Sequence, residues 1–246
     1  MSNENSDYFT SQRREIEEQG FITDELLATD ADCPVFGINL ACAYPFPTSV
    51  EGPYAAMAAR LAKLDDGVYV YPIWETHITI VTFLNFSLHR RPAPERLEEL
   101  RSCIGPIGAL MRSLFDTEAI DAFRLEFQPP VLLRKAVILP VTNPSGEIAR
   151  LRWRVSQLLE DKKQLHEKLL RGGLNVPGII HSTIMRFTKA PRDLPGFTAG
   201  FDAVAAATEP FVMTAREILL TVETKPYMRA GEIVQRFALG GAQRSP

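Results

Sequence analysis

Short runs rich in apolar and β-branched residues recur along the chain, separated by segments that contain proline or glycine. Several runs alternate apolar with polar residues, the period of two that is typical of strands with one buried face. The pattern predicts strands at residues 35–44, 68–72, 77–83, 123–127, 135–141, 181–187, 217–222 and 232–239.

Apolar residues three or four positions apart predict helices between these strands. The helical pattern covers residues 11–19, 54–64, 94–104 and 143–171. Pro106 is expected to end the third helix, because proline lacks an N–H and clashes with the preceding turn. Asn143 as cap and Pro144 in the first turn are expected to start the fourth and longest helix, which runs to Gly172.

The order strand, helix, strand, strand recurs approximately in each half of the chain, and the last strand in each half is residues 77–83 or 181–187. Because helices and strands interleave over short connections, we expect an α+β fold with two related lobes. Residues 1–32 are polar and acidic, with too few apolar positions for a core of their own, and are interpreted as an extension that docks or stays mobile. Residues 33–240 are interpreted as the folded domain, and residues 241–246 as a frayed tail.

One strand pattern occurs twice. Residues 77–83 read HITIVTF and residues 181–187 read HSTIMRF, so His, Thr, Ile and Phe recur at the same offsets 104 positions apart. The period of two places His77 and Thr79 on one face of the first strand, and His181 and Thr183 on one face of the second. Two such strands facing each other across a cleft would form a paired acid–base site.

Several other side chains are weaker candidates. Tyr44, Trp74 and Tyr227 could provide a base-stacking surface near the cleft, although such aromatic residues more often serve only packing. Arg186 alternates to the face opposite His181, so we do not expect it to contact a phosphate.

The remaining histidines, His89 and His166, lack the strand and threonine context and are expected to be ordinary surface or capping residues. The sequence contains no His-x-x-x-His pair and no cysteine cluster. We therefore expect neither a metal site nor another cofactor.

The amino-acid composition limits the class of protein and the compartment in which it is expected to act. With 46% hydrophobic residues among 246, the chain can bury a full core, and its formal net charge of −3 gives no basic track for long nucleic acids. Three cysteines, an odd number, suit a reducing compartment. No signal peptide and no apolar stretch of about 20 residues is evident, so we expect a soluble cytoplasmic protein without a membrane partner.

The two His-x-Thr strands, about a hundred residues apart in a mixed chain, resemble the 2H phosphoesterase superfamily, which includes 2′-5′ RNA ligase-like proteins and cyclic nucleotide phosphodiesterases. The resemblance covers roughly residues 35–239. It implies a bilobal α+β fold with a pseudo-twofold axis, antiparallel sheets lining a central cleft, helices outside and one motif strand in each lobe.

The resemblance also implies a reaction. It implies metal-independent hydrolysis of a 2′,3′-cyclic phosphate, or of a related phosphodiester, on a nucleotide or short RNA end. His77 and His181 would act as general base and general acid, and Thr79 and Thr183 would bind the phosphate oxygens. Which histidine fills which role stays open at this point.

Two alternatives remain beside cyclic phosphate hydrolysis. RNA-end processing or 2′-5′ RNA ligase-like activity would use the same four residues. A nucleotide-binding module without turnover would keep the cleft, but binding alone requires only hydrogen-bond donors and leaves the paired histidines without a purpose.

Overall fold

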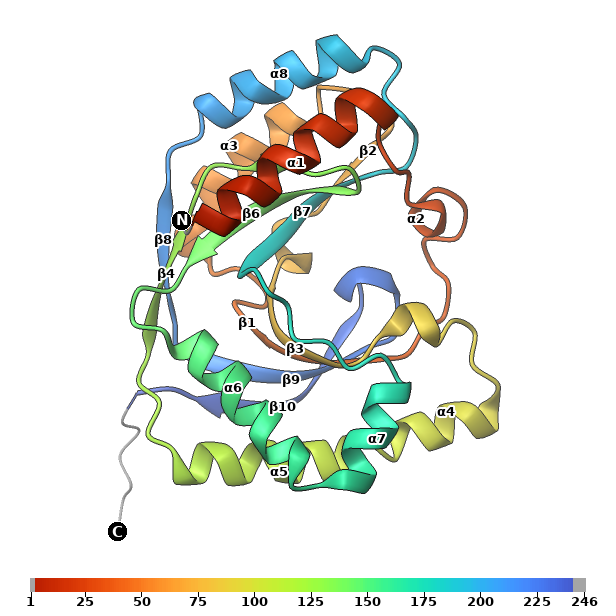
Figure 1. The fold of residues 1–246 in the computed structure, drawn as a ribbon, viewed down its shortest axis with the longest axis vertical. Coiled ribbons are helices and arrows are strands. Elements are labelled where there is room, and N and C mark those ends of the chain that lie inside the picture. Colours follow the sequence, from red (N-terminus) through yellow and green to blue (C-terminus); the bar gives the residue numbers. More distant parts are fainter. Residues whose placement is uncertain (1–2, 241–246) are drawn as a thin grey trace.

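The computed structural model describes residues 3–240 and contains two antiparallel sheets (Figure 1). The first sheet consists of β1 (Gly37–Cys42), β3 (Ile78–Leu84), β9 (Glu217–Glu223) and β10 (Gly231–Ala238), in the order β10-β9-β1-β3. The second consists of β2 (Val68–Val70), β4 (Phe123–Phe127), β5 (Val131–Leu132), β6 (Ala136–Thr142), β7 (His181–Phe187) and β8 (Phe211–Ala215), in the order β2-β7-β6-β4-β8 with β5 paired to β6.

Helices cover both sheets. They are α1 (Asn3–Gln19), α2 (Glu25–Thr29), α3 (Glu51–Leu61), α4 (Pro94–Arg101), α5 (Ile104–Thr117), α6 (Glu147–Glu160), α7 (Lys163–Arg171) and α8 (Leu194–Ala206). In Figure 1, α1, α3 and α8 gather at the second sheet, and α4 to α7 gather at the first. The predicted α+β architecture, with antiparallel sheets and outer helices, is confirmed.

The two sheets draw on distant parts of the chain. Strand β9 lies between β10 and β1, and β2 pairs with β7. Each lobe therefore combines early and late segments, and the lobes are not the two halves of the sequence.

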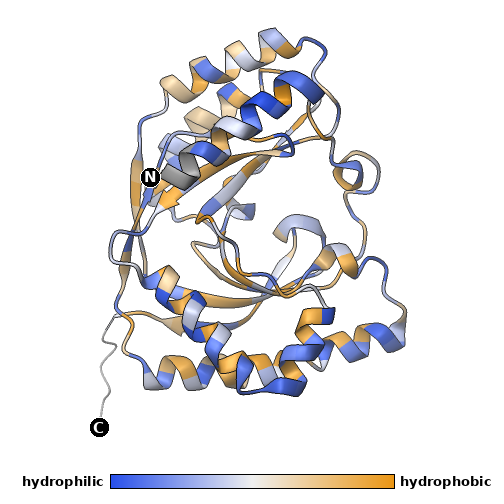
Figure 2. Cartoon of the chain, in the orientation of Figure 1, coloured by the Kyte–Doolittle hydropathy of each residue, from blue (hydrophilic) through white to orange (hydrophobic). Residues whose placement is uncertain are grey.

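The apolar residues of the repeated motif anchor each motif strand in the core. Ile80 and Phe83 of β3, and Ile184 and Phe187 of β7, all have 0% exposure. Figure 2 shows hydrophobic residues concentrated along the strands and in stripes on the helices. Burial of this kind contributes about 1.5–3 kcal/mol for each large side chain, so the motif strands are firmly held.

The helices differ from expectation in several places. The long helix expected over residues 143–171 begins only at Glu147, with Gly146 rather than Asn143 as its N-cap. It is also interrupted, because Lys162 leaves the helical conformation between α6 and α7. Its apolar stripe continues across the break, since Val155 and Leu169 are both fully buried. Pro106 does not end a helix but lies in the first turn of α5, where its missing N–H has no partner to lose. The pattern did not predict α2, α5, α8, β5 or β8.

The N-terminal extension is docked on the domain. Ile16 of α1 is fully buried, and the ring of Phe21 stacks on Phe187 with centroids 4.1 Å apart. The Nε of Arg134 donates a hydrogen bond of 3.1 Å to the carbonyl of Gly20. The extension thus contributes to the core of the second lobe.

Some expectations concern the remaining parts of the chain. Residues 241–246, the expected frayed tail, lie outside the described residues. Cys33, Cys42 and Cys103 are free and buried. Across residues 3–240, no helix has the length and apolar character needed to cross a bilayer, and no three His, Cys, Asp or Glu side chains are grouped as a metal site.

Candidate active site

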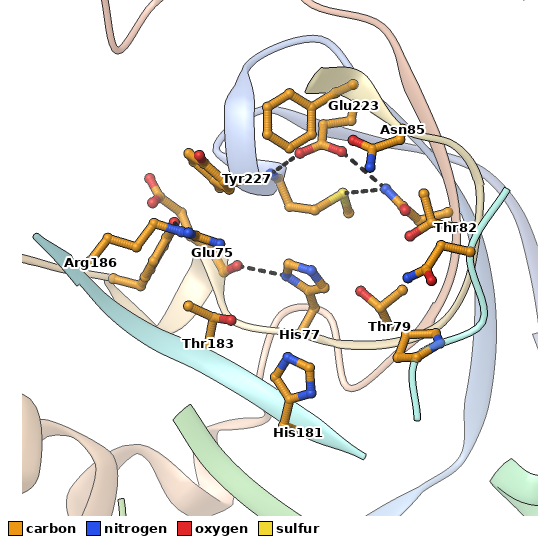
Figure 3. A pocket seen from close by; sticks show the side chains of 16 residues that line it. Glu75, His77, Thr79, Thr82, Asn85, His181, Thr183, Arg186, Glu223 and Tyr227 are labelled. Carbon is orange, nitrogen blue, oxygen red and sulfur yellow. Dashed lines mark hydrogen bonds between the residues drawn. The ribbon is translucent and has the colours of Figure 1, made fainter. Parts of the chain in front are cut away.

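The two copies of the motif meet in one cavity. Strand β3 brings Thr79 and, from the residue before it, His77, whereas β7 brings His181 and Thr183 from the other sheet (Figure 3). All four side chains line a cavity of about 260 Å³. The structure therefore brings the four residues of the repeated motif together, as the alternation of the strands indicates.

Each motif strand carries a bulge at the same offset from its histidine. On β3, Thr79 and Val81 face consecutive residues of β1, so Ile80 has no partner, and on β7 Ile184 is skipped opposite β6 in the same way. A bulge shifts the alternation by one position. The residue five positions after each histidine, Thr82 in β3 and Arg186 in β7, consequently lines the cavity.

The face of the strand expected for Arg186 was wrong for this reason. Uninterrupted alternation places it opposite His181, but the bulge at Ile184 turns it into the cavity (Figure 3). The repetition of apolar residues at offsets three and four was the available signal, but a sequence alone does not tell a bulge from a slightly longer buried run.

Both histidines are oriented by the same backbone contact. The Nδ1 of His77 lies 3.1 Å from the carbonyl oxygen of Glu75, and the Nδ1 of His181 lies 3.2 Å from that of Ile179. A carbonyl oxygen only accepts, so Nδ1 carries the proton in both rings. Nε2 is then the nitrogen available to a ligand in each case.

Burial favours the neutral form of both rings. It lowers the pKa of His77 to about 4, against the hydrogen bond to Glu75, and the charges of His181 and Arg186 add to the lowering. The pKa of His181 is also lowered by burial, against the bond to Ile179, and Arg152 and Arg186 contribute. Burial thus lowers the pKa of both rings, but the charged groups that add to the lowering differ between them.

Arg186 is held beside the histidines by three groups. Its guanidinium carbon lies 4.0 Å from the ring centroid of Tyr227, and its Nε donates to the hydroxyl of Tyr71 at 3.1 Å. Its Nη1 lies 3.5 Å from Asp24 Oδ2, which also accepts the hydroxyl of Tyr227. The docked extension therefore supplies a carboxylate that fixes a cation of the cavity.

Comparison with known proteins identifies the fold. No protein-family model matches the chain, and no curated protein sequence does. TT0787 of Thermus thermophilus matches in structure with a TM-score of 0.54 at 18% identity, covering 84% of this chain and 100% of that chain. ATU0111, a conserved protein of unknown function from Agrobacterium tumefaciens strain C58, matches with a TM-score of 0.54 at 15% identity, over 88% of this chain and 94% of that one.

The chain shares the fold of these two proteins, and this is the bilobal fold expected for the 2H phosphoesterase superfamily. Escherichia coli LigT complexed with ATP matches more weakly, with a TM-score of 0.47 at 12% identity over 84% of this chain and 99% of that chain. At these identities the likeness concerns the fold and does not extend to a reaction.

In this fold, a buried arginine joins the two motif strands. Arg152 of α6 donates from Nε to the carbonyl of Ile80 at 3.1 Å and from Nη2 to that of Thr79 at 3.2 Å. The same Nη2 lies 3.5 Å from the carbonyl of Ile179, the group that orients His181. Arg152 is therefore a positioning residue that links the backbones beneath both histidines.

Replacing Arg152 with methionine is expected to lower the free energy of unfolding by about 3 kcal/mol, because buried carbonyl groups lose their donors. Urea unfolding followed by circular dichroism measures the change. Arg150→Met is the matched control, since Arg150 lies on the same helix but is exposed. Equal stability of the two variants would contradict the role assigned to Arg152.

A second buried group shapes the wall of the cavity in this fold. Glu223 accepts hydrogen bonds from the N–H of Met228 at 2.8 Å and from Nδ2 of Asn39 at 3.1 Å. Burial raises the pKa of Glu223 to about 7, while these donors oppose the rise. Tyr227 and Met228 both have positive φ, 63° and 61°, which costs energy in non-glycine residues. Glu223 thus holds the strained turn that presents Tyr227 to Arg186.

The three aromatic candidates occupy different places. Tyr227 lines the cavity, whereas Tyr44 and Trp74 do not. The ring of Tyr44 lies edge-on to His77, with centroids 6.0 Å apart, and Trp74 is 65% exposed.

The other two histidines, His89 and His166, lie outside the cavity. His89 is buried at the end of a 3-10 turn, and His166 lies on α7.

Proposed function

We propose that this chain is a metal-independent phosphodiesterase that hydrolyses a 2′,3′-cyclic phosphate, or a related phosphodiester, on a nucleotide or RNA end. One observation carries the proposal: imidazoles from opposite sheets line the same cavity, and each has its Nδ1 bound to a backbone carbonyl. This arrangement presents two Nε2 atoms of the same type to a single phosphorus. Binding alone would not require such a pair.

The reaction divides the two proton transfers between the rings. Burial lowers the pKa of His77 to about 4, so its ring is neutral at pH 7 and its Nε2 takes the proton from the attacking water. As the new P–O bond forms and the bond to the ribose oxygen breaks, His181 gives a proton to that oxygen. The bound phosphate anion favours the protonated form of His181.

The negative charge of the phosphate is balanced by fixed groups. The hydroxyls of Thr79 and Thr183 donate hydrogen bonds to the non-bridging oxygens, one from each motif strand. Arg186 adds a positive charge held in place by Tyr71, Tyr227 and Asp24. Groups already oriented before the reaction lose little free energy in reorganisation.

The decisive experiment is turnover of the four nucleoside 2′,3′-cyclic monophosphates in excess EDTA. Hydrolysis that survives EDTA supports the proposal, and separation of the 2′- and 3′-phosphate products identifies which ribose oxygen leaves. Activity that disappears with EDTA and returns on adding a divalent metal contradicts it.

The pH dependence of kcat/KM should have a maximum between about pH 4 and pH 6.5. The rate rises as pH increases through about 4, because His77 loses its proton and becomes a base. The rate falls as pH increases through the pKa of His181, which burial lowers below 6.5, because His181 then has no proton to donate. Initial rates below KM measure this profile, and a rate that stays flat or rises between pH 5 and 9 would contradict the assignment.

A further inference from the structure

A second cavity adjoins the candidate active site, and most of the residues that line it have no part in the reaction described above. Its volume is about 490 Å³. It shares His181, Thr183 and Arg186 with the first cavity. A ligand with its phosphate at the paired histidines can therefore extend into either space.

The floor of the second cavity continues the inner face of β7 onto β6. Ala136 pairs with Arg186, and Ile138 pairs with Thr183. Cross-strand partners point to the same side of a sheet, so these small and aliphatic side chains extend the surface that begins at the phosphate site.

The opposite wall comes from the N-terminal extension. Tyr8, Gln12 and Glu15 of α1 line the cavity, and α1 packs against β5 (Figure 1). The side-chain oxygen of Gln12 accepts the N–H of Arg134 at 3.4 Å, which ties the helix to the turn between β5 and β6. The extension therefore forms one wall of this cavity as well as contributing to the core.

Two cations stand at this cavity beyond Arg186. Arg134 is fixed, with its Nε on the carbonyl of Gly20 at 3.1 Å and its Nη1 at 3.6 Å from Glu15. Lys135 is exposed and makes no ion pair with the described residues. Lys135 is the cation that remains available to a ligand.

A nucleoside 2′,3′-cyclic monophosphate cannot use these groups, because it has one base and its only phosphate lies at the histidines. An RNA end of two or more nucleotides has a second phosphate, 5′ to the terminal nucleoside, and a second base. Lysine and arginine bind phosphate, and an exposed tyrosine ring stacks on any base. Tyr8 is 42% exposed and lines the same space.

We infer that the second cavity binds the penultimate nucleotide of an RNA end, with Lys135 at the internucleotide phosphate and Tyr8 against the base. This inference rests on the proposed function, since it takes the terminal phosphate to lie at the paired histidines. It makes an oligonucleotide end a better substrate than a mononucleotide.

Binding tests the inference without requiring turnover. Isothermal titration calorimetry compares the dinucleotide ApAp, which ends in a 3′-phosphate, with 3′-AMP. The wild-type protein should bind ApAp about tenfold more tightly, the scale of one stacked base. Lys135→Ala and Tyr8→Ala should each reduce that preference to about threefold or less, whereas Lys63→Ala, an exposed lysine outside the cavity, should keep it.

Turnover separates this inference from the proposed function. Lys135→Ala should leave kcat/KM for adenosine 2′,3′-cyclic phosphate unchanged and lower it for the dinucleotide cyclic phosphate. Equal affinity of the wild type for ApAp and 3′-AMP, or a preference that survives both substitutions, would overturn the second site. A preference for ApAp without turnover of any cyclic phosphate would support the second site and count against hydrolysis.

A different arrangement of the ligand in the two cavities predicts a different reaction. If the second cavity instead holds the second nucleoside of a linear diester, the dinucleoside monophosphate ApA should be cleaved between its nucleosides. That outcome would place the reacting phosphate between the two cavities and would overturn the assignment to the penultimate nucleotide.

Discussion

Alanine in place of His77 or His181 is expected to lower kcat for cyclic phosphate hydrolysis at least about 100-fold, the usual scale for loss of a general acid or base. KM should change little, because neither ring is needed to hold the phosphate oxygens. Initial-rate kinetics on the best nucleoside 2′,3′-cyclic phosphate measure both parameters.

The control and the double variant sharpen this test. His166→Ala, a histidine on α7 outside the cavity, should retain wild-type kcat. The variant lacking both His77 and His181 should be only slightly slower than either single variant, because groups that act as a unit are not additive. Retention of more than a tenth of the wild-type kcat by either single variant would exclude the paired mechanism.

Valine at Thr79 or Thr183 should lower kcat about 100-fold for each substitution, since a preoriented donor to the phosphoryl oxygens is lost. Valine preserves the shape and the strand preference of threonine, so the loss reports the hydroxyl group. Steady-state rates, with the melting temperature as a check of folding, measure the effect.

Serine provides the complementary control. Thr79→Ser and Thr183→Ser keep the hydroxyl and should retain most of the activity. Thr117→Val, on α5 far along the chain from either motif, should have no effect on rate. If serine and valine variants were equally impaired, the methyl group rather than the hydroxyl would be the important feature, and the assigned role would be wrong.

The meeting of the four motif residues in one cavity could be predicted, because they come from a regular local pattern. His77 and Thr79 share a face through simple alternation, and so do His181 and Thr183. Arg186 could not be placed in the same way, because the bulge at Ile184 depends on pairing with β6, a strand far away in sequence. The local hydrophobic pattern does not indicate how a strand pairs with a distant one.

The helices show a similar limit. The apolar stripe of α6 and α7 is continuous, so it concealed the break at Lys162, where only the backbone changes direction. Pro106 was expected to end a helix because proline is incompatible with a helix interior. Proline is equally compatible with the first turn of a new helix, which is where Pro106 lies. In both cases the pattern of apolar side chains is compatible with two backbone conformations, and tertiary packing determines which one forms.

The contribution of the extension to the core and to the cavity could not be predicted, because it comes from a few residues that contact parts of the chain distant in sequence. Ile16 and Phe21 enter the core of the second lobe, and Asp24 reaches Arg186 and Tyr227 in the cavity. A low density of apolar residues correctly indicated that this segment has no core of its own. It could not indicate that the segment would share another one.

The exchange of early and late strands between the sheets also determines when the protein can fold during its synthesis. Strand β1 leaves the ribosome early, but its partner β9 begins only at Glu217. Until then one edge of β1 is unpaired, and distant pairings of this kind form slowly. A nascent or prematurely terminated chain would expose that edge to other chains, which favours aggregation. Production of this protein should therefore benefit from slow translation and from chaperones that bind the chain until its last strands are complete.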